Sequence, residues 1–242
     1  MPEPLFDVLI LIARPAAGKS EIIQFLKNTP LERRQGRFHA GVIDEIDDFP
    51  MLWTWFEEDD LLAQMGHARL HTTPDGSFRW LYLWDVLIRR ISLEYHKHLR
   101  DRSGNPQPVT TLVEFARGKQ HGGFRRAFKH LSPELLARAA ILYINVSYAE
   151  SLRKNRRRFN PDRPDSILEH GLSDEKMQQL YAEVDWHELT RGKLEGYLAI
   201  QGMQVPYVVF ENEDDVTTPG GEALGVRLET ALSRLWQLYN RA

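Results

Sequence analysis

Eight residues near the N-terminus, from Ala13 to Ser20, combine the residue types that hold a polyphosphate. They follow an apolar run and fit the pattern G-x-x-x-x-G-K-[ST], with Ala13 in the first position and Gly18-Lys19-Ser20 at the end. In such a loop the backbone N–H groups and the N-terminus of the next helix donate to phosphate oxygens. Lys19 is expected to reach the β- and γ-phosphates, and Ser20 to ligate Mg²⁺. A chance Gly-Lys-Ser in an unrelated strand–turn–helix is the alternative.

The sequence therefore predicts a nucleotide site with ATP and Mg²⁺ as its ligands. The residues expected to contact the nucleotide are Arg14, Pro15, Ala16, Ala17, Gly18, Lys19, Ser20, Glu21 and, from a later helix, Arg156.

Carboxylates near the ends of two predicted strands are candidates for the base and the metal ligands of phosphoryl transfer. Asp44 and Glu45 follow the second strand, with Asp47 close behind, and Glu114 ends the third. Because successive strand residues point to opposite sides, only one of Asp44 and Glu45 can face the nucleotide. We favour Asp44 as base or metal ligand and Asp47 next. Glu114 is placed near the metal, which gives Ser20, Asp44 and Glu114 as the predicted Mg²⁺ set. A solvated acidic turn is the other interpretation.

Arginines cluster after the fourth predicted strand. Arg153, Arg156 and Arg157 share one helix face through 3–4 spacing, and guanidinium groups bind phosphate oxygens with paired hydrogen bonds. We therefore predict a lid over residues 151–170 in which Arg153 and Arg157 stabilise the transferring phosphoryl group. A solvated basic helix and a nucleic-acid patch are the alternatives. Acceptor contacts are expected from Glu45, Asp47, Arg79, Glu114 and Arg117.

The elements that must position these groups alternate between strands and helices. Apolar, β-branched runs predict strands at 5–12, 38–43, 109–115, 140–146 and 205–210. Amphipathic spacing predicts helices, most clearly over 80–99 and 222–239. This alternation predicts a three-layer α/β/α sandwich around a five-stranded parallel sheet, in a single domain spanning 1–242. Residues 46–80 form an acceptor-side segment that carries no substrate motif.

Composition limits the classes of partner. The 242 residues carry a net charge of −3, which argues against nucleic acid as a partner, and no cysteine, which excludes disulfides and thiol catalysis. The apolar run 8–13 is far shorter than the roughly 20 residues of a membrane helix, and no signal peptide is evident. We expect a cytoplasmic protein without a membrane partner. The oligomeric state stays open, a homodimer included.

Several of these motifs occur in the order found in one family group. The chain resembles the deoxynucleoside kinases and nucleoside-monophosphate kinases, which are kinase-like P-loop NTPases. The resemblance lies in the loop 16–20, in Asp44-Glu45 followed by Trp53, in Glu114-Phe115-Ala116-Arg117 and in the arginines of 153–158. Residues 205–210 with Asn212-Glu213-Asp214 are similar to the last strand and adenine-side loop of that group.

The resemblance implies ATP-dependent phosphoryl transfer to a small molecule such as a nucleoside or nucleotide. Two other classes remain open at this point. One is a P-loop ATPase that couples hydrolysis to a protein partner, and the other is a nucleotide-binding module with little catalysis. Acceptor-stimulated turnover distinguishes the kinase from both.

Overall fold

One six-stranded sheet forms the centre of the computed structural model, which describes residues 5–102, 107–158 and 172–241. The strand order is β2-β3-β1-β4-β6-β5, and every neighbouring pair is parallel except β5 with β6. The strands are β1 (Val8–Ala13), β2 (Val42–Asp47), β3 (Val109–Phe115), β4 (Ala139–Asn145), β5 (Glu195–Ile200) and β6 (Met203–Glu211). The predicted parallel sheet is therefore present, but an antiparallel edge strand that the sequence did not reveal makes it mixed.

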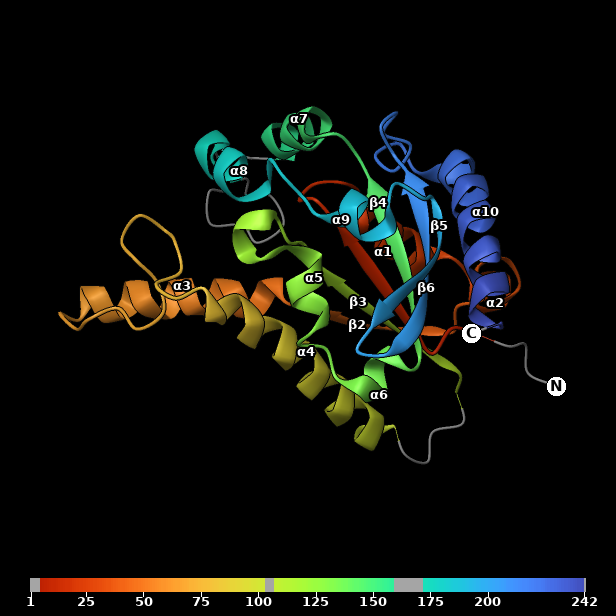
Figure 1. Cartoon of the computed structure of the whole chain (residues 1–242), viewed down its shortest axis with the longest axis horizontal. Helices are drawn as coiled ribbons and strands as arrows, with labels where there is room; N and C mark the ends of the chain where they lie inside the picture. The colour runs from red at the N-terminus through yellow and green to blue at the C-terminus, as the bar shows by residue number, and fades with distance from the viewer. Residues whose placement is uncertain (1–4, 103–106, 159–171, 242) are drawn as a thin grey trace.

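Helices cover both faces of this sheet (Figure 1). The helices of the described chain are α1 (Lys19–Asn28), α2 (Leu31–Phe38), α3 (Phe49–Gln64), α4 (Tyr82–Asp101), the 3₁₀ turn η1 (Lys119–His121), α5 (Gly123–Phe128), α6 (Pro133–Leu136), α7 (Tyr148–Arg158), α8 (Asp174–Tyr181), α9 (Trp186–Thr190) and α10 (Gly221–Tyr239). The chain is thus an α/β protein with three layers.

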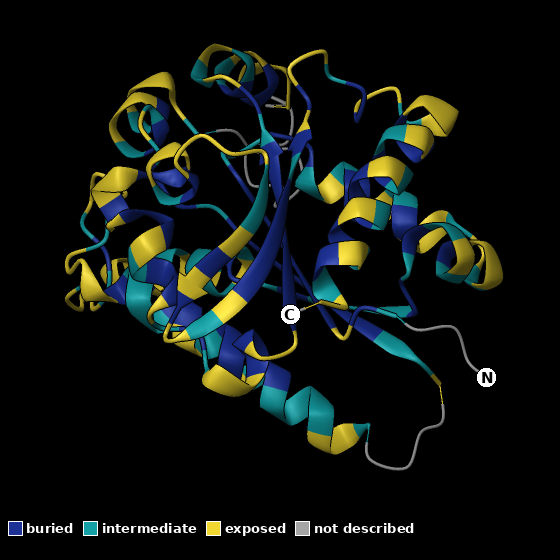
Figure 2. Ribbon diagram, turned by 45° about the vertical axis from the view of Figure 1, so that its right-hand side comes forward, coloured by how far each residue is buried: buried dark blue, intermediate teal, exposed yellow. Residues whose placement is uncertain are grey.

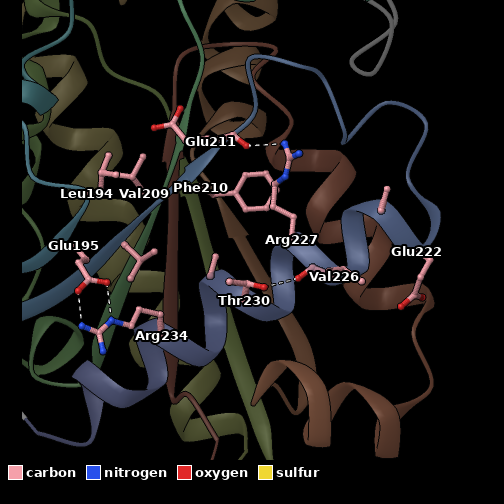
Figure 3. Close-up of a pocket in the computed structure, with 13 residues that line it drawn as sticks. Leu194, Glu195, Val209, Phe210, Glu211, Glu222, Val226, Arg227, Thr230 and Arg234 are labelled. Carbon is pink, nitrogen blue, oxygen red and sulfur yellow. Dashed lines mark hydrogen bonds and ion pairs between the residues drawn. The ribbon is translucent and has the colours of Figure 1, made fainter.

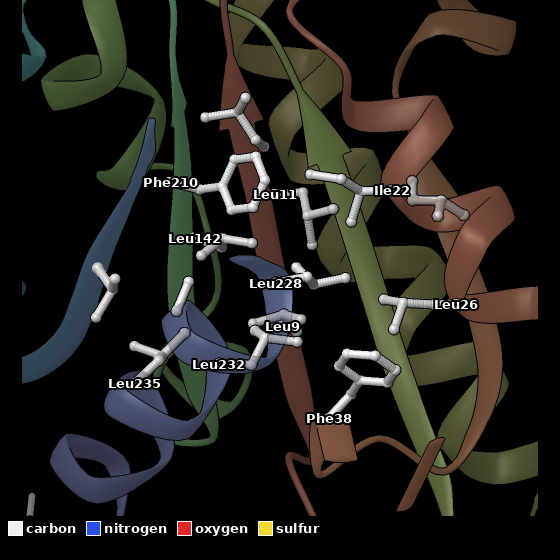
Figure 4. Close-up of a cluster of buried hydrophobic side chains, with 14 of the residues drawn as sticks. Leu9, Leu11, Ile22, Leu26, Phe38, Leu142, Phe210, Leu228, Leu232 and Leu235 are labelled. Carbon is white, nitrogen blue, oxygen red and sulfur yellow. The ribbon is translucent and has the colours of Figure 1, made fainter. Parts of the chain in front are cut away.

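The first face is covered by α1, α2 and α10. Leucines recur at three- or four-residue spacing along α10, and that stripe is buried against the strands. Figure 4 shows how Leu228 and Leu232 of α10 meet Leu9 and Leu142 of the sheet, with Ile22 of α1 beside them. This face holds the helix whose N-terminus closes the predicted phosphate loop.

The second face packs against α4, α5, α6 and α9. Ile88 and Ile91 of α4, Phe124 of α5 and Trp186 of α9 join Ile10 of β1 in one buried cluster. Because β1 is buried on both faces, all six of its residues are apolar and inaccessible to water (Figure 2).

The second predicted strand was placed too early in the sequence. Residues 31–38 form α2, which ends where His39 adopts the left-handed conformation with φ of 51°. The strand β2 begins only at Val42 and continues to Asp47. The carboxylates at 44, 45 and 47 therefore lie within the strand rather than after it.

An arm formed by α3 and the segment 65–81 projects from the sheet (Figure 1). The arm is held together by Asp59, which is fully buried and accepts hydrogen bonds from the amides of Leu70, His71 and Thr72 at 2.5–2.9 Å. Lys176 of α8 donates to Ser77 of the arm at 2.5 Å. The arm is thus fixed internally by one carboxylate and touches the helix that follows the predicted lid.

Among the described residues, no helix is both long and apolar enough to span a lipid bilayer.

Candidate functional site

The predicted phosphate loop lies at the carboxyl end of the sheet's central parallel strand. β1 ends at Ala13 and α1 begins at Lys19, so residues 14–18 form the connection. From β1 the chain continues to β2, which lies on one side of β1 in the sheet. From β3 the chain later crosses to β4, which lies on the other side of β1. Ligands of open α/β sheets bind in the crevice outside such a reversal point. The loop therefore occupies the position at which the topology favours a ligand.

The backbone of this loop is bent into an unusual shape. Ala16 has φ of 53° and Gly18 has φ of 111°. A Cβ atom on Gly18 would lie 2.5 Å from Thr217 Oγ1 and 2.9 Å from Asn212 Nδ2, so only glycine fits there. Gly18 is the N-cap of α1, and among the described residues no side chain caps this helix end. The first amides of α1 are consequently available to an anion.

Two carbonyl groups of the loop accept hydrogen bonds from side chains of neighbouring elements. Ser151 Oγ donates to the carbonyl of Pro15, and Asn212 Nδ2 donates to the carbonyl of Ala17, both at 2.8 Å. Arg14 extends away from the loop and donates to the carbonyls of Val146 at 3.0 Å and Tyr181 at 3.2 Å. The side chain of Arg14, predicted as a nucleotide contact, therefore anchors the loop to the residue that follows β4 and to the end of α8.

Two carboxyl groups lie side by side next to this loop. Asp47 ends β2 in register with Glu114 near the end of β3, and Glu114 is in register with Leu11 of β1. Burial raises the pKa of Asp47 to about 9, and the charges of Glu114 and Asp48 act in the same direction. Burial also raises the pKa of Glu114, against the opposing effect of the Lys19 ammonium.

Two close carboxyl groups cannot both ionise easily in a buried site, so the charge of Glu114 adds to the effect of burial on the pKa of Asp47. Glu114 is buried, and its Oε2 has no hydrogen-bond partner among the described residues. The pair thus offers a proton-binding group and an unsatisfied oxygen near Lys19.

The structure does not bring Asp44 or Glu45 to the loop. Asp44 lies in the middle of β2, where His98 Nδ1 approaches its Oδ2 to 2.8 Å and Arg102 also pairs with it. Through Thr111 it is in register with Val8, five residues before Ala13, or about 16 Å along the strand. Glu45 faces the opposite side and pairs with Lys27 at the end of α1. The predicted alternation of these two residues is confirmed, whereas their expected position at the strand end is wrong.

Arg117 and Arg79, both expected to contact the acceptor, have protein partners. Arg117 is 2% exposed, pairs with Asp48 at 2.5 Å and lies over the ring of Trp84 at 5.0 Å. It fixes the turn between β2 and α3, next to Asp47. Arg79 donates to the carbonyl of Arg69 within the arm.

The arginines of α7 begin just after Ser151, the residue that donates a hydrogen bond to the loop. Arg153 pairs with Glu150 at 2.7 Å and with Asp215 at 3.0 Å, and Arg156 pairs with Asp174 of α8. Arg157 is exposed, with no ion partner among the described residues. Most of the predicted lid, residues 159–170, lies outside the described part of the chain.

Two polar residues that sequence reasoning did not place in the site, Thr217 and Lys154, lie directly behind the loop together with Asn212, which the resemblance had placed on the adenine side. Asn212 and Thr217 follow β6 and are buried, and Lys154 of α7 is buried beside them. A signal for Lys154 exists in the sequence. Ser151, Lys154 and Asn155 form a narrow polar stripe at helical spacing, and in the structure this stripe is the buried side of α7.

A separate groove of about 740 Å³ lies between α10 and the strands β5 and β6 (Figure 3). Its apolar wall includes Leu194 and Val226, and Arg234 at its edge pairs with Glu195 at 2.5 Å. The groove includes no residue of the phosphate loop, and we do not place the functional site there.

Metal ligation by protein groups alone is not indicated. The part of the chain that the structure describes holds no group of three or more His, Asp or Glu side chains arranged to bind a metal. A nucleotide-bound Mg²⁺ needs fewer protein ligands, because it is usually held by one or two carboxylates together with the phosphates.

Neither a scan against protein-family models nor a search of curated proteins finds a match to this chain.

Proposed function

We propose that this chain is an ATP-binding P-loop protein that transfers the γ-phosphate of ATP to a hydroxyl- or phosphate-bearing small molecule. The observation that carries the proposal is the loop 14–18. Two of its carbonyl groups accept hydrogen bonds from Ser151 and Asn212, and no side chain of the described residues caps the N-terminus of α1. A loop whose carbonyls are occupied in this way, in front of an uncapped helix N-terminus, suits a phosphate group, because backbone amides in such loops bind anions. Lys19, the first residue of α1, adds the positive charge.

The carboxyl pair fits the Mg²⁺ that accompanies ATP. The oxygen Glu114 Oε2 is buried without a hydrogen-bond partner in the described chain, which is unfavourable unless a cation or donor meets it. Glu114 and the hydroxyl of Ser20 would hold the ion. When bound, Mg²⁺ neutralises charge on the phosphates.

Asp47 and Glu114 also explain how the acceptor would lose its proton. A pair that shares one proton and one negative charge near neutral pH can still accept a proton. In the transfer, the acceptor oxygen forms a bond to the γ-phosphorus and the bond to the bridging oxygen breaks. ADP leaves, and the hydroxyl proton passes to the pair. Lys19 stabilises the charge that develops on the phosphoryl oxygens.

A base beside the phosphate loop favours a catalyst over a binding module, because it can take the proton of an attacking hydroxyl; the response to an acceptor separates the kinase from an ATPase, whose water would use the same base. An ATPase would turn over without an acceptor, and a binding module would show no turnover with or without one. Candidate acceptors are therefore compared by their stimulation of ADP release from Mg·ATP.

The loop assignment is tested by calorimetry of Mg·ATP binding to wild type, Lys19→Ala and Lys27→Ala. Lys27 is a matched control because it lies in the last turn of the same helix and pairs with Glu45. We expect Lys19→Ala to weaken binding at least tenfold, or about 1.4 kcal/mol, with Lys27→Ala close to wild type. Equal affinities for wild type and Lys19→Ala would remove the basis of the proposal.

A further inference from the structure

Lys154 is a charged side chain in an unusual position. It lies on the inner side of α7, is 6% exposed, and donates from Nζ to Asp215 Oδ1 at 2.6 Å and to Thr217 Oγ1 at 3.0 Å. Burial alone would raise the pKa of Asp215, but hydrogen bonds from Lys154 and Thr218 hold that pKa below its ordinary value. A buried ammonium is tolerated only with such partners.

The network that begins at Lys154 ends on the phosphate loop. Thr217 Oγ1 accepts from Lys154 and also from Asn212 Nδ2, the latter at 2.8 Å. The same Asn212 amide donates to the carbonyl of Ala17 at 2.8 Å. Thr217 Oγ1 also occupies the space against which Gly18 is packed. Two side chains therefore separate the lysine from the loop backbone.

We propose that Lys154 is a positioning residue that holds the phosphate loop in its anion-binding shape. The inference rests on the proposed function, in that the loop is taken to bind a nucleotide phosphate. The ammonium fixes which way the lone pairs and the proton of the Thr217 hydroxyl point. This leaves the Asn212 amide directed at Ala17.

Strain in the loop makes this support necessary. Ala16 and Gly18 both have positive φ, a conformation that a non-glycine residue keeps only when its surroundings enforce it. Without Lys154, the Asp215 carboxylate keeps its hydrogen bonds from Arg153 and Thr218, but the Thr217 hydroxyl loses the hydrogen bond from its charged donor. The loop then gains alternative backbone conformations, and its amides no longer keep one fixed arrangement.

The test compares Lys154→Met with Lys119→Met. Lys119 is a matched control because it also pairs with a carboxylate at 2.6 Å, that of Glu188, but its side chain is 40% exposed. Amide hydrogen exchange of Arg14 and of residues 16–18 is measured on the nucleotide-free protein, and Mg·ATP affinity is measured on the same samples. We expect Lys154→Met to raise exchange at least tenfold and to weaken Mg·ATP binding at least tenfold. Lys119→Met should change neither.

Each other outcome is decisive. Unchanged exchange in a folded Lys154→Met protein overturns the proposal, and so does raised exchange with unchanged affinity. If wild type itself fails to bind Mg·ATP, the proposed function is lost, and exchange alone then decides whether Lys154 orders the loop. Should Lys154→Met not fold, Thr217→Val is used instead, because it removes the hydroxyl that joins Lys154 to Asn212 at nearly constant side-chain shape. The exchange and the affinity of that variant then decide the question by the same criteria.

Discussion

Replacing Asp47 by Asn removes a carboxyl group whose pKa is raised by burial to about 9. In the unfolded chain this group titrates near 3.9. Between these values the folded protein binds more protons than the unfolded one, so the free energy of unfolding falls as pH rises. The Asn side chain has nearly the same shape and does not titrate.

The size of the effect follows from linkage. One group in this window contributes at most about 1.4 kcal/mol per pH unit, or about 2.7 kcal/mol between pH 5 and pH 7. Because Glu114 shares the site and screening reduces the shift, we expect about 1–2 kcal/mol. For a protein of this size that corresponds to roughly 2–8 °C in melting temperature.

The assay is urea unfolding of wild type and Asp47→Asn at pH 5, 6 and 7, followed by tryptophan fluorescence. Wild type should lose more stability than Asp47→Asn over this range. Glu45→Gln is the control, because Glu45 lies on the same strand but pairs with Lys27 away from the loop. If wild type and Asp47→Asn show the same pH slope, the carboxyl pair is not protonated as we argue.

Three further results are expected. Binding of Mg·ATP at pH 7 should release about one proton from the carboxyl pair, seen by calorimetry in buffers of different ionisation enthalpy, and no release would contradict the shared proton. Gly18→Ala should destabilise the protein by about 1–3 kcal/mol in urea unfolding, because its Cβ would meet Thr217 Oγ1 at 2.5 Å; wild-type stability would refute the close packing. Asp59→Ala should expose residues 65–81 to limited proteolysis, because three amides lose their acceptor; an uncut arm would show that other contacts suffice.

Local sequence patterns were sufficient for the elements that carry a strong signal. The strand β3 spans Val109–Phe115, as its apolar run indicated, and α4 follows the predicted amphipathic spacing. The loop between β1 and α1 also lies where the residues 13–20 placed it. In each case one short stretch contains the whole signal.

The edge strand β5 was missed because its turn is atypical. Ile200 is in register with Met203, so Gln201-Gly202 is a two-residue hairpin loop, and both residues have positive φ. That geometry is usually marked by Asn-Gly or Asp-Gly. Gln-Gly has the required glycine but lacks the favoured first residue.

Which residues form the carboxyl pair depends on the register between strands far apart in the chain, and a single sequence does not show that register. Asp44, Glu45 and Asp47 were all plausible until β2 was aligned with β3, which puts Asp47 opposite Glu114. Lys154 was missed for a related reason. Its helix is rich in arginine and was interpreted as a lid that acts through its arginines, although its inner stripe of Ser151, Lys154 and Asn155 packs behind the loop.

The junction between β2 and α3 connects the arm directly to the proposed base, Asp47. Phe49, the first residue of α3, donates its amide proton to Asp47 Oδ1 at 2.9 Å. The proposed base and the arm thus belong to one continuous stretch of chain, and the first turn of α3 sets the orientation of the Asp47 carboxyl group.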